Sequence, residues 1–299
     1  MRRLRAVAIA LALAASCPAP ALAGQVGATD ATGARVALAA PAQRIVSLAP
    51  HATELLFAAG AGERVVGVLD PANWPPQAAR LPRVGDARGL DLERIVALRP
   101  DLAIVWPYLA PAQVERLREL GIAIFVSDPL TPDAIATDIE RLGTLAGSDL
   151  AAANTAAAFR ARLAALEARE ARQTETKLPV FYEIWNQPLY TVGGRHLISA
   201  ALELCGGTNV FAPLPLPAPQ VSVEAVLAAQ PAAIVAGTDG ALRPAWLDEW
   251  RRWRGLPAVA HANLFVVDAD LLHRAGPRFV DGLAQLCAAL DTARANMRR

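Results

Sequence analysis

The chain has 299 residues, which is long enough for two domains that each bury an apolar core. Its formal net charge of +1 lacks the basic excess that nucleic-acid-binding proteins carry, so we expect no nucleic-acid partner. After residue 23 the sequence contains no apolar run of membrane-spanning length, so we expect no transmembrane segment in the mature chain.

The first 23 residues are typical of a cleavable secretory signal peptide. An arginine-rich start precedes an apolar core at Ala6–Ala15, and Ala21-Leu22-Ala23 forms a small-x-small cleavage site. Loss of the three leader arginines changes the net charge from +1 to −2. Cys17 suits lipid attachment, but the leucine expected three residues earlier is Ala14, so we expect a periplasmic protein without a lipid anchor.

Strands and helices alternate between residues 44 and 146, after a small predicted hairpin at residues 25–43. The predicted strands are 44–48, 65–68, 102–105 and 122–126. The predicted helices are 53–59, 111–120 and 133–146, together with a capped helix of about two turns before the strand at 102–105. This alternation implies a parallel sheet.

Residues 148–176 predict one long helix, because no proline or glycine interrupts them and Ser148 with Asp149 offers an N-cap. Phe159 and Leu163 lie on one apolar face of this helix, which would be roughly 42 Å long. The predicted organisation is a signal peptide at 1–23, an N-terminal α/β lobe at 24–147, the connecting helix at 148–176 and a C-terminal α/β lobe at 177–299.

The second half repeats the alternation of strands and helices. Predicted strands lie at 180–184 and 264–267, and predicted helices at 196–204, 246–253 and 279–290. The intervening residues 212–219 (APLPLPAP) form a proline-stiffened loop. We therefore expect an α/β protein with two parallel-sheet lobes bridged by one long helix.

An internal repeat supports two related lobes. Residues 91–105 (DLERIVALRPDLAIV) align without a gap with residues 222–236 (SVEAVLAAQPAAIVA), and both copies predict a capped helix, a proline stop and a buried strand. Glu93 and Glu224 occupy the same place in the two copies. The alternative explanation is that such phrases are common in unrelated α/β proteins.

The loops at the carboxyl ends of the predicted strands are the expected place for a ligand. They contain many aromatic residues and few charges, which suits a large, flat, mostly apolar ligand with some polar edges. The alternative is that Trp74 and Trp185 are ordinary packing residues. The candidate ligand-binding residues are His51, Trp74, Arg88, Trp106, Trp185, Tyr190, Asp270 and Arg274.

An enzymatic function has little support in the sequence. No GxSxG, HExxH, Walker or GxGxxG motif occurs, so we name no catalytic residue and no cofactor. The four histidines are scattered, with His196 and His261 on predicted structural elements, so we expect no metal site of three histidines. His51 could be an axial ligand to a metal held in a macrocycle, or simply a hydrogen-bonding residue.

Several phrases together resemble the periplasmic cobalamin-binding proteins of ABC importers. The resemblance covers residues 44–290 and rests on RIVSLAPHATELLFAAGAGERVVGV, WPP, GLDLERIVALRPDLAIVW, CGGTNVF and PQVSVEAVLA. It implies a receptor that captures cobalamin between two lobes bridged by a long helix and delivers it to a permease. The wider family also captures haem and ferric siderophores, so a haem or siderophore carrier is the close alternative and a periplasmic enzyme a more distant one.

The resemblance also implies ligand contacts. They would fall on His51, Pro71, Ala87, Tyr190, Ala218 and the loop Asp270–Arg274. Of these, only Tyr190, Asp270 and Arg274 keep the character expected at their positions. The aromatic residues that the best-known members place at Pro71, Ala87 and Ala218 are missing here. The tryptophans at 74, 106 and 185 could compensate for them.

Cys205 and Cys287 remain once the leader is removed. An even count in an oxidising compartment favours a disulfide, with two buried free thiols as the alternative. The resemblance implies the disulfide, because the CGG and QLC phrases match those of the family.

Glu93 and Glu224 lie in the first turns of their predicted helices, where the helix dipole alone favours an acidic side chain. The resemblance implies a second role, in which each glutamate meets a basic pocket on one of two like permease subunits. We therefore expect a monomeric receptor that docks on a permease dimer through these two residues.

Overall fold

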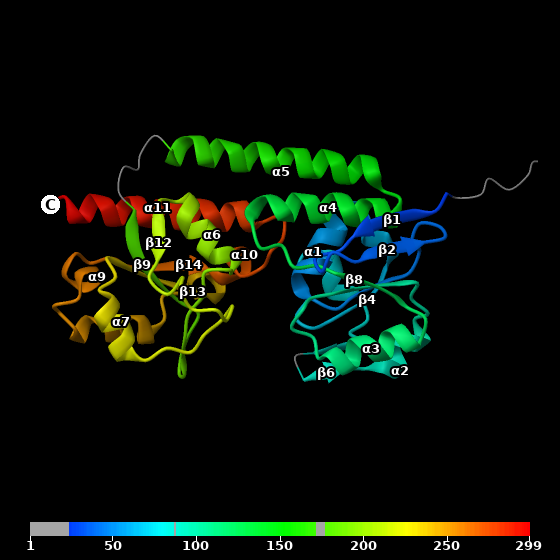
Figure 1. The fold of residues 1–299 in the computed structure, drawn as a ribbon, viewed down its shortest axis with the longest axis horizontal. Coiled ribbons are helices and arrows are strands. Elements are labelled where there is room, and N and C mark those ends of the chain that lie inside the picture. The colour runs from blue at the N-terminus through cyan, green and yellow to red at the C-terminus, as the bar shows by residue number, and fades with distance from the viewer. Residues whose placement is uncertain (1–23, 87, 172–176) are drawn as a thin grey trace, which may run out of the picture.

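Two four-stranded parallel sheets organise the chain, one in each half, and long helices run across both on one side (Figure 1). This computed structural model describes residues 24–86, 88–171 and 177–299. The predicted leader, including Cys17, lies outside the described residues, as do Ala87 and the last five residues of the predicted connecting helix. The predicted fold class, two parallel-sheet lobes and a long helix, is confirmed.

The N-terminal lobe, from β1 to α4, contains the sheet β4-β3-β7-β8. Two small antiparallel pairs, β1 with β2 and β5 with β6, lie outside this sheet. Its elements are β1 (Val26–Thr29), β2 (Arg35–Leu38), β3 (Ile45–Ser47), α1 (Pro50–Ala58), β4 (Val65–Val68), β5 (Gly85–Asp86), β6 (Gly89–Leu90), α2 (Leu92–Ala97), β7 (Leu102–Val105), α3 (Pro111–Glu119), β8 (Ala123–Val126) and α4 (Pro132–Ala146).

The C-terminal lobe, from β9 to α11, contains the sheet β12-β9-β13-β14. A short antiparallel hairpin of β10 and β11 follows β9. Its elements are β9 (Leu178–Glu183), β10 (Trp185–Asn186), β11 (Leu189–Tyr190), α6 (Leu197–Leu204), β12 (Gly207–Asn209), α7 (Val223–Ala229), β13 (Ala233–Thr238), α8 (Ala245–Asp248), α9 (Pro257–Ala260), β14 (Leu264–Asp268), α10 (Ala269–Leu272) and α11 (Phe279–Met297).

The two sheets have the same topology. In each, the first strand along the chain lies between the second and the third, and the fourth pairs with the third. The two repeat copies become α2 with β7 and α7 with β13, so each copy supplies the third strand of its sheet. The predicted internal repeat is therefore a repeat of structure.

Helix caps explain why the repeat helices begin where they do. The Asp91 carboxylate accepts a hydrogen bond from the Arg94 amide at 2.9 Å, and the Ser222 hydroxyl accepts one from the Ala225 amide at 3.2 Å. Each bond satisfies an amide that has no partner inside its helix. The strands that follow are apolar on both faces, as central strands of covered parallel sheets are.

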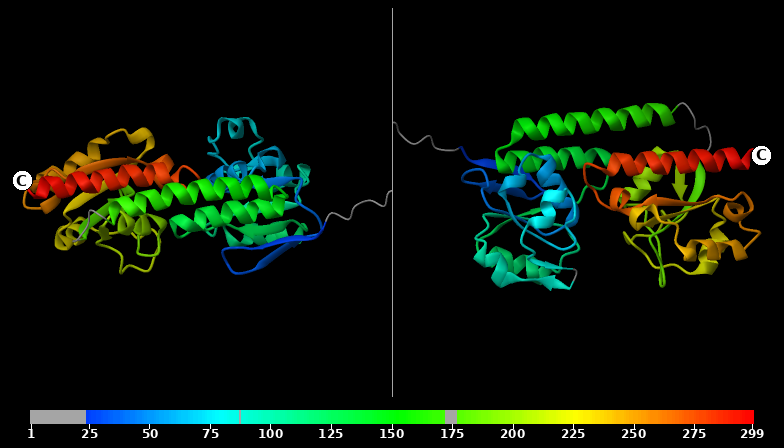
Figure 2. Two further views of the ribbon diagram at one scale, coloured as in Figure 1. Left: turned by 90° about the horizontal axis from the view of Figure 1, so that it is seen from above. Right: turned by 180° about the vertical axis from the view of Figure 1, so that it is seen from behind.

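The long helix α5 spans Asp149–Glu170, which is shorter than the predicted 148–176, and residues 172–176 are not described. Ser148 precedes the helix, but its side chain does not cap it; the hydroxyl donates instead to the carbonyl of Ala59 at 2.6 Å. Ser148 is therefore the N-cap residue as predicted, but its hydroxyl links the start of α5 to the end of α1 instead of capping the helix. Figure 2 shows α5 running alongside α4 and α11.

Three other predictions about local structure need correction. His51 lies in the first turn of α1, which begins at Pro50, rather than in the predicted loop. Asp270 lies in the one-turn helix α10 rather than in a loop. The predicted helix at residues 246–253 is divided between α8 and a 3₁₀ turn at Glu249–Arg252.

One apolar core runs through both lobes on the side of the long helices. It joins Leu55 of α1 and Leu142 of α4 to Phe159 of α5, and continues through Leu202 of α6 to Leu286 of α11. Two smaller cores lie on the opposite faces of the two sheets, one in each lobe. The lobes therefore share the apolar layer beneath the long helices.

Cys205 at the end of α6 and Cys287 in α11 form a disulfide, and both are fully buried. The predicted pairing is confirmed, and it joins two helices of the C-terminal lobe. In the described part of the chain, no helix combines the length and the apolar character needed to cross a bilayer.

We expect the disulfide to stabilise the protein against heat. Closing a loop of 82 residues contributes about 4 kcal/mol on the chain-entropy model, so reduction should lower the melting temperature by several degrees. Calorimetry with and without reductant measures the melting temperature. A Cys205→Ser/Cys287→Ser variant should melt at the temperature of the reduced protein, with no further change when reductant is added. Denatured, unreduced protein from the periplasm should show no free thiol; two reactive thiols per mature chain would contradict the pairing.

Candidate functional site

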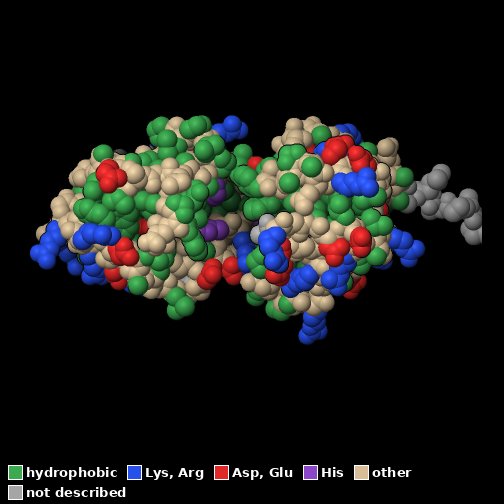
Figure 3. Space-filling model, turned by 90° about the horizontal axis from the view of Figure 1, so that it is seen from below, with side chains coloured by type: hydrophobic (Ala, Val, Ile, Leu, Met, Phe, Trp, Pro, Cys, Tyr) green, Lys and Arg blue, Asp and Glu red, His purple; other side chains and the backbone are tan. Residues whose placement is uncertain are grey.

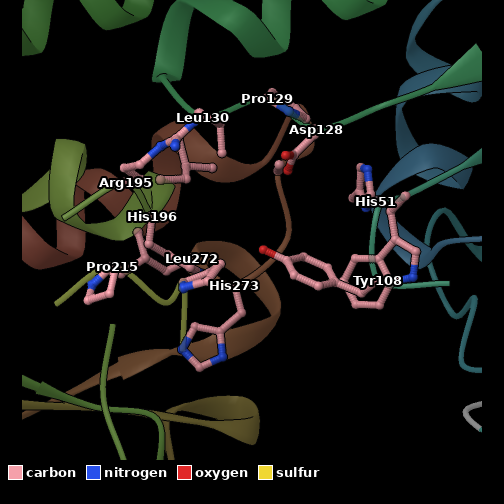
Figure 4. A pocket seen from close by; sticks show the side chains of 14 residues that line it. His51, Tyr108, Asp128, Pro129, Leu130, Arg195, His196, Pro215, Leu272 and His273 are labelled. Carbon is pink, nitrogen blue, oxygen red and sulfur yellow. The ribbon is translucent and has the colours of Figure 1, made fainter. Parts of the chain in front are cut away.

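A cavity of about 350 Å³ lies between the two lobes. Its N-terminal wall comes from residues that follow β3, β7 and β8, and its C-terminal wall from residues after β11, β12 and β14 (Figure 4). Seen from below, histidine side chains lie in the groove between the lobes among apolar side chains (Figure 3). The cavity is therefore at the carboxyl ends of strands, the usual ligand position in parallel sheets.

The N-terminal wall is largely aromatic. His51, in the first turn of α1, is 7% exposed, and the centroid of its ring lies 6.0 Å from that of Trp106. Trp106 in turn meets Tyr108 edge to face, with centroids 5.1 Å apart. Asp128, after β8, adds a carboxylate to this wall. The N-terminal wall therefore presents aromatic ring surfaces and one carboxylate to the cavity.

The C-terminal wall supplies a cation and two imidazoles. Arg195 and His196 come just before α6, and His273 follows α10. The Nδ1 atom of His196 accepts a hydrogen bond from the Ile198 amide at 3.1 Å, which leaves the neutral ring with its proton on Nε2. His273 Nε2 lies 2.9 Å from the buried Tyr182 hydroxyl, which fixes the orientation of its ring.

Burial shifts the titration of the lining groups towards their neutral forms. Desolvation lowers the pKa of His51 to about 4, against an opposing effect of the Ser127 backbone, and it lowers the pKa of His196 to about 4. Burial raises the pKa of Asp128, although Arg195 acts in the opposite direction. The pKa of Tyr108 rises through burial and the nearby Asp128. Both histidines are therefore neutral at pH 7.

The structure brings two of the eight predicted ligand-binding residues to the cavity wall, His51 and Trp106. Trp185 and Tyr190 are paired across the β10–β11 hairpin, and Trp185 is 59% exposed. Arg88 lies on the β5–β6 hairpin, where its guanidinium pairs with Asp86. These three residues lie outside the cavity lining.

The other three predicted residues, Trp74, Asp270 and Arg274, lie at the junction of the lobes. Asp270 pairs with Arg274 at 2.7 Å, and Arg274 also reaches Glu54 of α1. Trp74 stacks on the guanidinium of Arg278, with 4.6 Å between the guanidinium carbon and the ring centroid. They too lie outside the cavity lining.

The histidines are far apart in the sequence, but the prediction that they are also scattered in the structure is wrong. Three of the four line this cavity: His51, His196 and His273. The described residues nevertheless contain no group of three or more His, Cys, Asp or Glu side chains placed to hold a metal ion. The three imidazoles therefore face a shared space without forming a metal site.

Sequence reasoning missed Tyr108, Asp128, Arg195 and His196 as lining residues, and it reached His273 only as part of the segment Asp270–Arg274 that the resemblance implies for the ligand. Asp128 comes two residues after the predicted strand at 122–126, in the loop at its carboxyl end, so the strand-end rule would have found it. His196 was assigned to a helix, whereas it is the residue that caps α6 from outside. No local signal marks Arg195, which reaches the cavity because the chain after β11 returns to it.

The residues around the cavity suit binding by shape and stacking. Aromatic faces and apolar side chains such as Leu272 alternate with a few polar groups that can fix the orientation of a ligand. The volume is at the lower end of the range for ligand pockets, so a large ligand would fill it only in part and extend along the cleft.

Comparison with known proteins matches residues 45–271 to the family described as periplasmic binding protein. The chain belongs to the periplasmic binding protein family. A vitamin B12-binding protein of Vibrio campbellii is 36% identical over 255 residues, which cover 85% of this chain and 91% of the relative. The vitamin B12-binding protein of Photorhabdus laumondii is 39% identical over 249 residues, 83% of this chain and 88% of the relative.

Solved structures of periplasmic binding proteins share the fold. The periplasmic vitamin B12 binding protein of Vibrio cholerae superposes with a TM-score of 0.78 at 37% identity, covering 85% of this chain and 98% of that one. A periplasmic heme-binding protein from Roseiflexus sp. RS-1 gives a TM-score of 0.73 at 28% identity, covering 84% and 99%. This periplasmic binding protein therefore has both corrinoid-binding and haem-binding relatives.

Because His51 is buried, we expect the free energy of unfolding to depend on pH. Its folded-state pKa of about 4 lies below the ordinary 6.5, so the unfolded chain binds a proton that the folded chain does not as pH falls between these values. Stability present above pH 6.5 should be lost progressively down to pH 4, by on the order of 3 kcal/mol for this residue.

Urea unfolding at pH 7.0, 5.5 and 4.5 measures this dependence. His51→Gln should reduce the loss of stability between pH 7.0 and pH 4.5 by the contribution of one histidine, whatever its effect on stability at pH 7. The contributions of His196 and His273 should remain, because burial lowers the pKa of each of them to about 4 as well. His261→Gln, at an exposed position, is the matched control and should keep the wild-type slope. An unchanged slope in His51→Gln would show that His51 does not carry the dependence.

Proposed function

We propose that this protein captures cobalamin in the cleft between its lobes and delivers it to the permease of an ABC importer. The single observation that carries the proposal is the cavity at the facing strand ends, with aromatic walls and few polar groups. The relatives named as vitamin B12-binding proteins cover most of the chain and support the same ligand. Binding, rather than turnover, is the function of the family to which the chain belongs.

The proposed ligand contacts extend beyond the cavity. Because a corrinoid is larger than the 350 Å³ space, we place His51 and Trp106 inside, with Tyr108, Asp128 and Arg195 beside them. The remaining predicted residues would meet parts of the ligand that extend along the cleft. These are Trp74, Arg88, Trp185, Tyr190, Asp270 and Arg274.

The organisation of the mature protein is part of the same proposal. We infer a cleaved leader at residues 1–23, domains at 24–147 and 177–299 joined by the helical segment 148–176, and a monomeric receptor without a lipid anchor at Cys17. The periplasmic location of the family agrees with an exported chain.

A haem carrier is the second candidate. Three imidazoles line the cavity, and burial lowers the pKa of each to about 4, so all three are neutral at pH 7. Neutral imidazole is a common axial ligand of haem iron. The 28% identical heme-binding relative supports this alternative. Against it, Arg195 is the only cation among the described lining residues, whereas haem carries two propionates that favour cationic partners.

Calorimetric titration with cyanocobalamin and with hemin separates the two candidates. We expect a cyanocobalamin isotherm of micromolar affinity or tighter and weaker binding of hemin. Trp106→Ala should weaken the corrinoid complex about tenfold, because aromatic contacts contribute roughly 0.5–1.5 kcal/mol beyond the area they bury. The absence of a corrinoid isotherm in the wild type would overturn the cobalamin assignment.

The positions of Glu93 and Glu224 support a role in docking. Glu93 and Glu224 are each the second residue of a capped helix, α2 and α7, and both are exposed. The two helices lie in different lobes, on the side of the molecule away from α5 (Figure 1). We propose that each glutamate pairs with a basic pocket on one permease subunit.

The double variant Glu93→Arg/Glu224→Arg should keep its fold and its corrinoid affinity but lose complex formation with the permease. Electrostatic pairs at an interface set the register and the association rate more than the stability of either partner. Glu115→Arg, on the exposed face of α3, is a matched charge control that should still dock. Pull-down assays measure complex formation with the permease, and uptake assays measure delivery of the ligand. Wild-type uptake by the double variant would show that neither glutamate is needed for docking.

A further inference from the structure

A buried carboxylate of the N-terminal lobe is held by two arginines of the C-terminal lobe. Glu54, in α1, is 1% exposed. Its Oε1 accepts from Arg278 Nη2 at 2.6 Å and from Arg274 Nη1 at 3.3 Å, and its Oε2 accepts from Arg278 Nε at 3.0 Å. The Glu54–Arg278 pair is therefore bidentate, the geometry that fixes both distance and orientation.

The neighbours of this cluster complete its hydrogen bonding. Arg274 also binds Asp270 and the side-chain oxygen of Asn73, and Arg278 lies against the ring of Trp74. Asn73 and Trp74 belong to the N-terminal lobe, so both arginines contact that lobe at two places. The two arginines are balanced by Glu54 and Asp270, so the cluster is neutral as a whole.

The backbone of the C-terminal lobe is adapted to the carboxylate. Gly276 lies between α10 and α11, and a Cβ atom built there would be 2.9 Å from Glu54 Oε2 and 3.2 Å from Glu54 Cβ. The angle φ of Gly276 is not in the left-handed region, so the backbone itself would accept alanine. A side chain at position 276 is excluded because Glu54 lies too close.

The segments that carry this cluster also carry the cavity walls. His51 lies one turn before Glu54 on α1, and His273 and Ala275 directly precede Gly276. The separation between the two walls therefore depends on how closely α1 approaches the segment between α10 and α11. The Glu54 ion pairs set that approach.

We propose that Glu54 is a positioning residue that sets the width of the cleft by clamping α1 to Arg274 and Arg278. Its importance for the ligand rests on the proposed corrinoid-binding function. Removing the charge of one partner in a buried ion pair leaves the other uncompensated, which favours water entry and separation of the two surfaces. Molecules with the wrong separation lower the apparent affinity in proportion to their population.

Two variants test the clamp by different routes. Glu54→Gln removes the charge at almost constant volume. Gly276→Ala keeps every charge but adds a methyl group only 2.9 Å from Glu54 Oε2, so the carboxylate must shift. Glu140→Gln is the matched control, because Glu140 forms a bidentate pair with Arg160 between α4 and α5, away from the cleft.

The width of the cleft is measured without ligand, by pulsed electron paramagnetic resonance between spin labels on Ala112→Cys and Ala228→Cys. These alanines are exposed, on α3 and α7, one in each lobe, and Cys205 and Cys287, the two cysteines outside the leader, are joined in the disulfide. Both clamp variants should give longer or broader distance distributions than the wild type, and Glu140→Gln should not. If either folded clamp variant keeps the wild-type distribution, the proposal is wrong.

Ligand titration then gives the functional effect. Cyanocobalamin affinity should fall about tenfold in each clamp variant if about a tenth of the molecules keep the competent width, with no change in Glu140→Gln. Wild-type affinity in both clamp variants would also overturn the proposal. If the wild type itself fails to bind cyanocobalamin, the proposed function is wrong, whereas the distance measurement still decides the clamp.

Discussion

The shared apolar layer beneath α4, α5 and α11 is the constraint on which the rest of the structure depends. It is continuous from Leu55 of the N-terminal lobe to Leu286 of the C-terminal lobe. Separating the lobes on this side would expose apolar surface at about 25 cal/mol per Å². The lobes are therefore fixed to each other along the long helices, and only the opposite side, where the strand ends face each other, is open to a ligand.

Because of this arrangement, the cleft is preformed and its walls can move only a little relative to each other. The cavity walls are held from behind by the apolar layer and at the junction by the Glu54 cluster. Within the cleft, orientation of the side chains is fixed locally, as with His273 by Tyr182 and His196 by the Ile198 amide. Preorganisation of this kind favours affinity, because fewer groups must be ordered when the ligand binds.

The fold was largely predictable, whereas the walls of the cavity were only partly so. Strand and helix positions follow from local signals such as the Asp91 and Ser222 caps, and the repeat extends them to a shared topology. Aromatic residues alone do not mark a ligand site: Trp106 reaches the cavity, but Trp74 covers an arginine that depends on the junction of the lobes. Glu54 looks like any helix residue, since its partners are more than 200 positions away in the sequence.

Helix α11 has a consequence for how the chain is made. It contributes Leu283, Leu286 and Leu290 to the shared apolar layer, supplies Cys287 for the disulfide, and follows directly after Arg278. A chain that is exported with its N-terminus first can build the sheet of its first lobe early. Until residues 279–297 arrive, however, the partly folded chain has an uncovered apolar face and an unpaired thiol at Cys205, so the second lobe can complete its core and its disulfide only after the end of the chain has emerged.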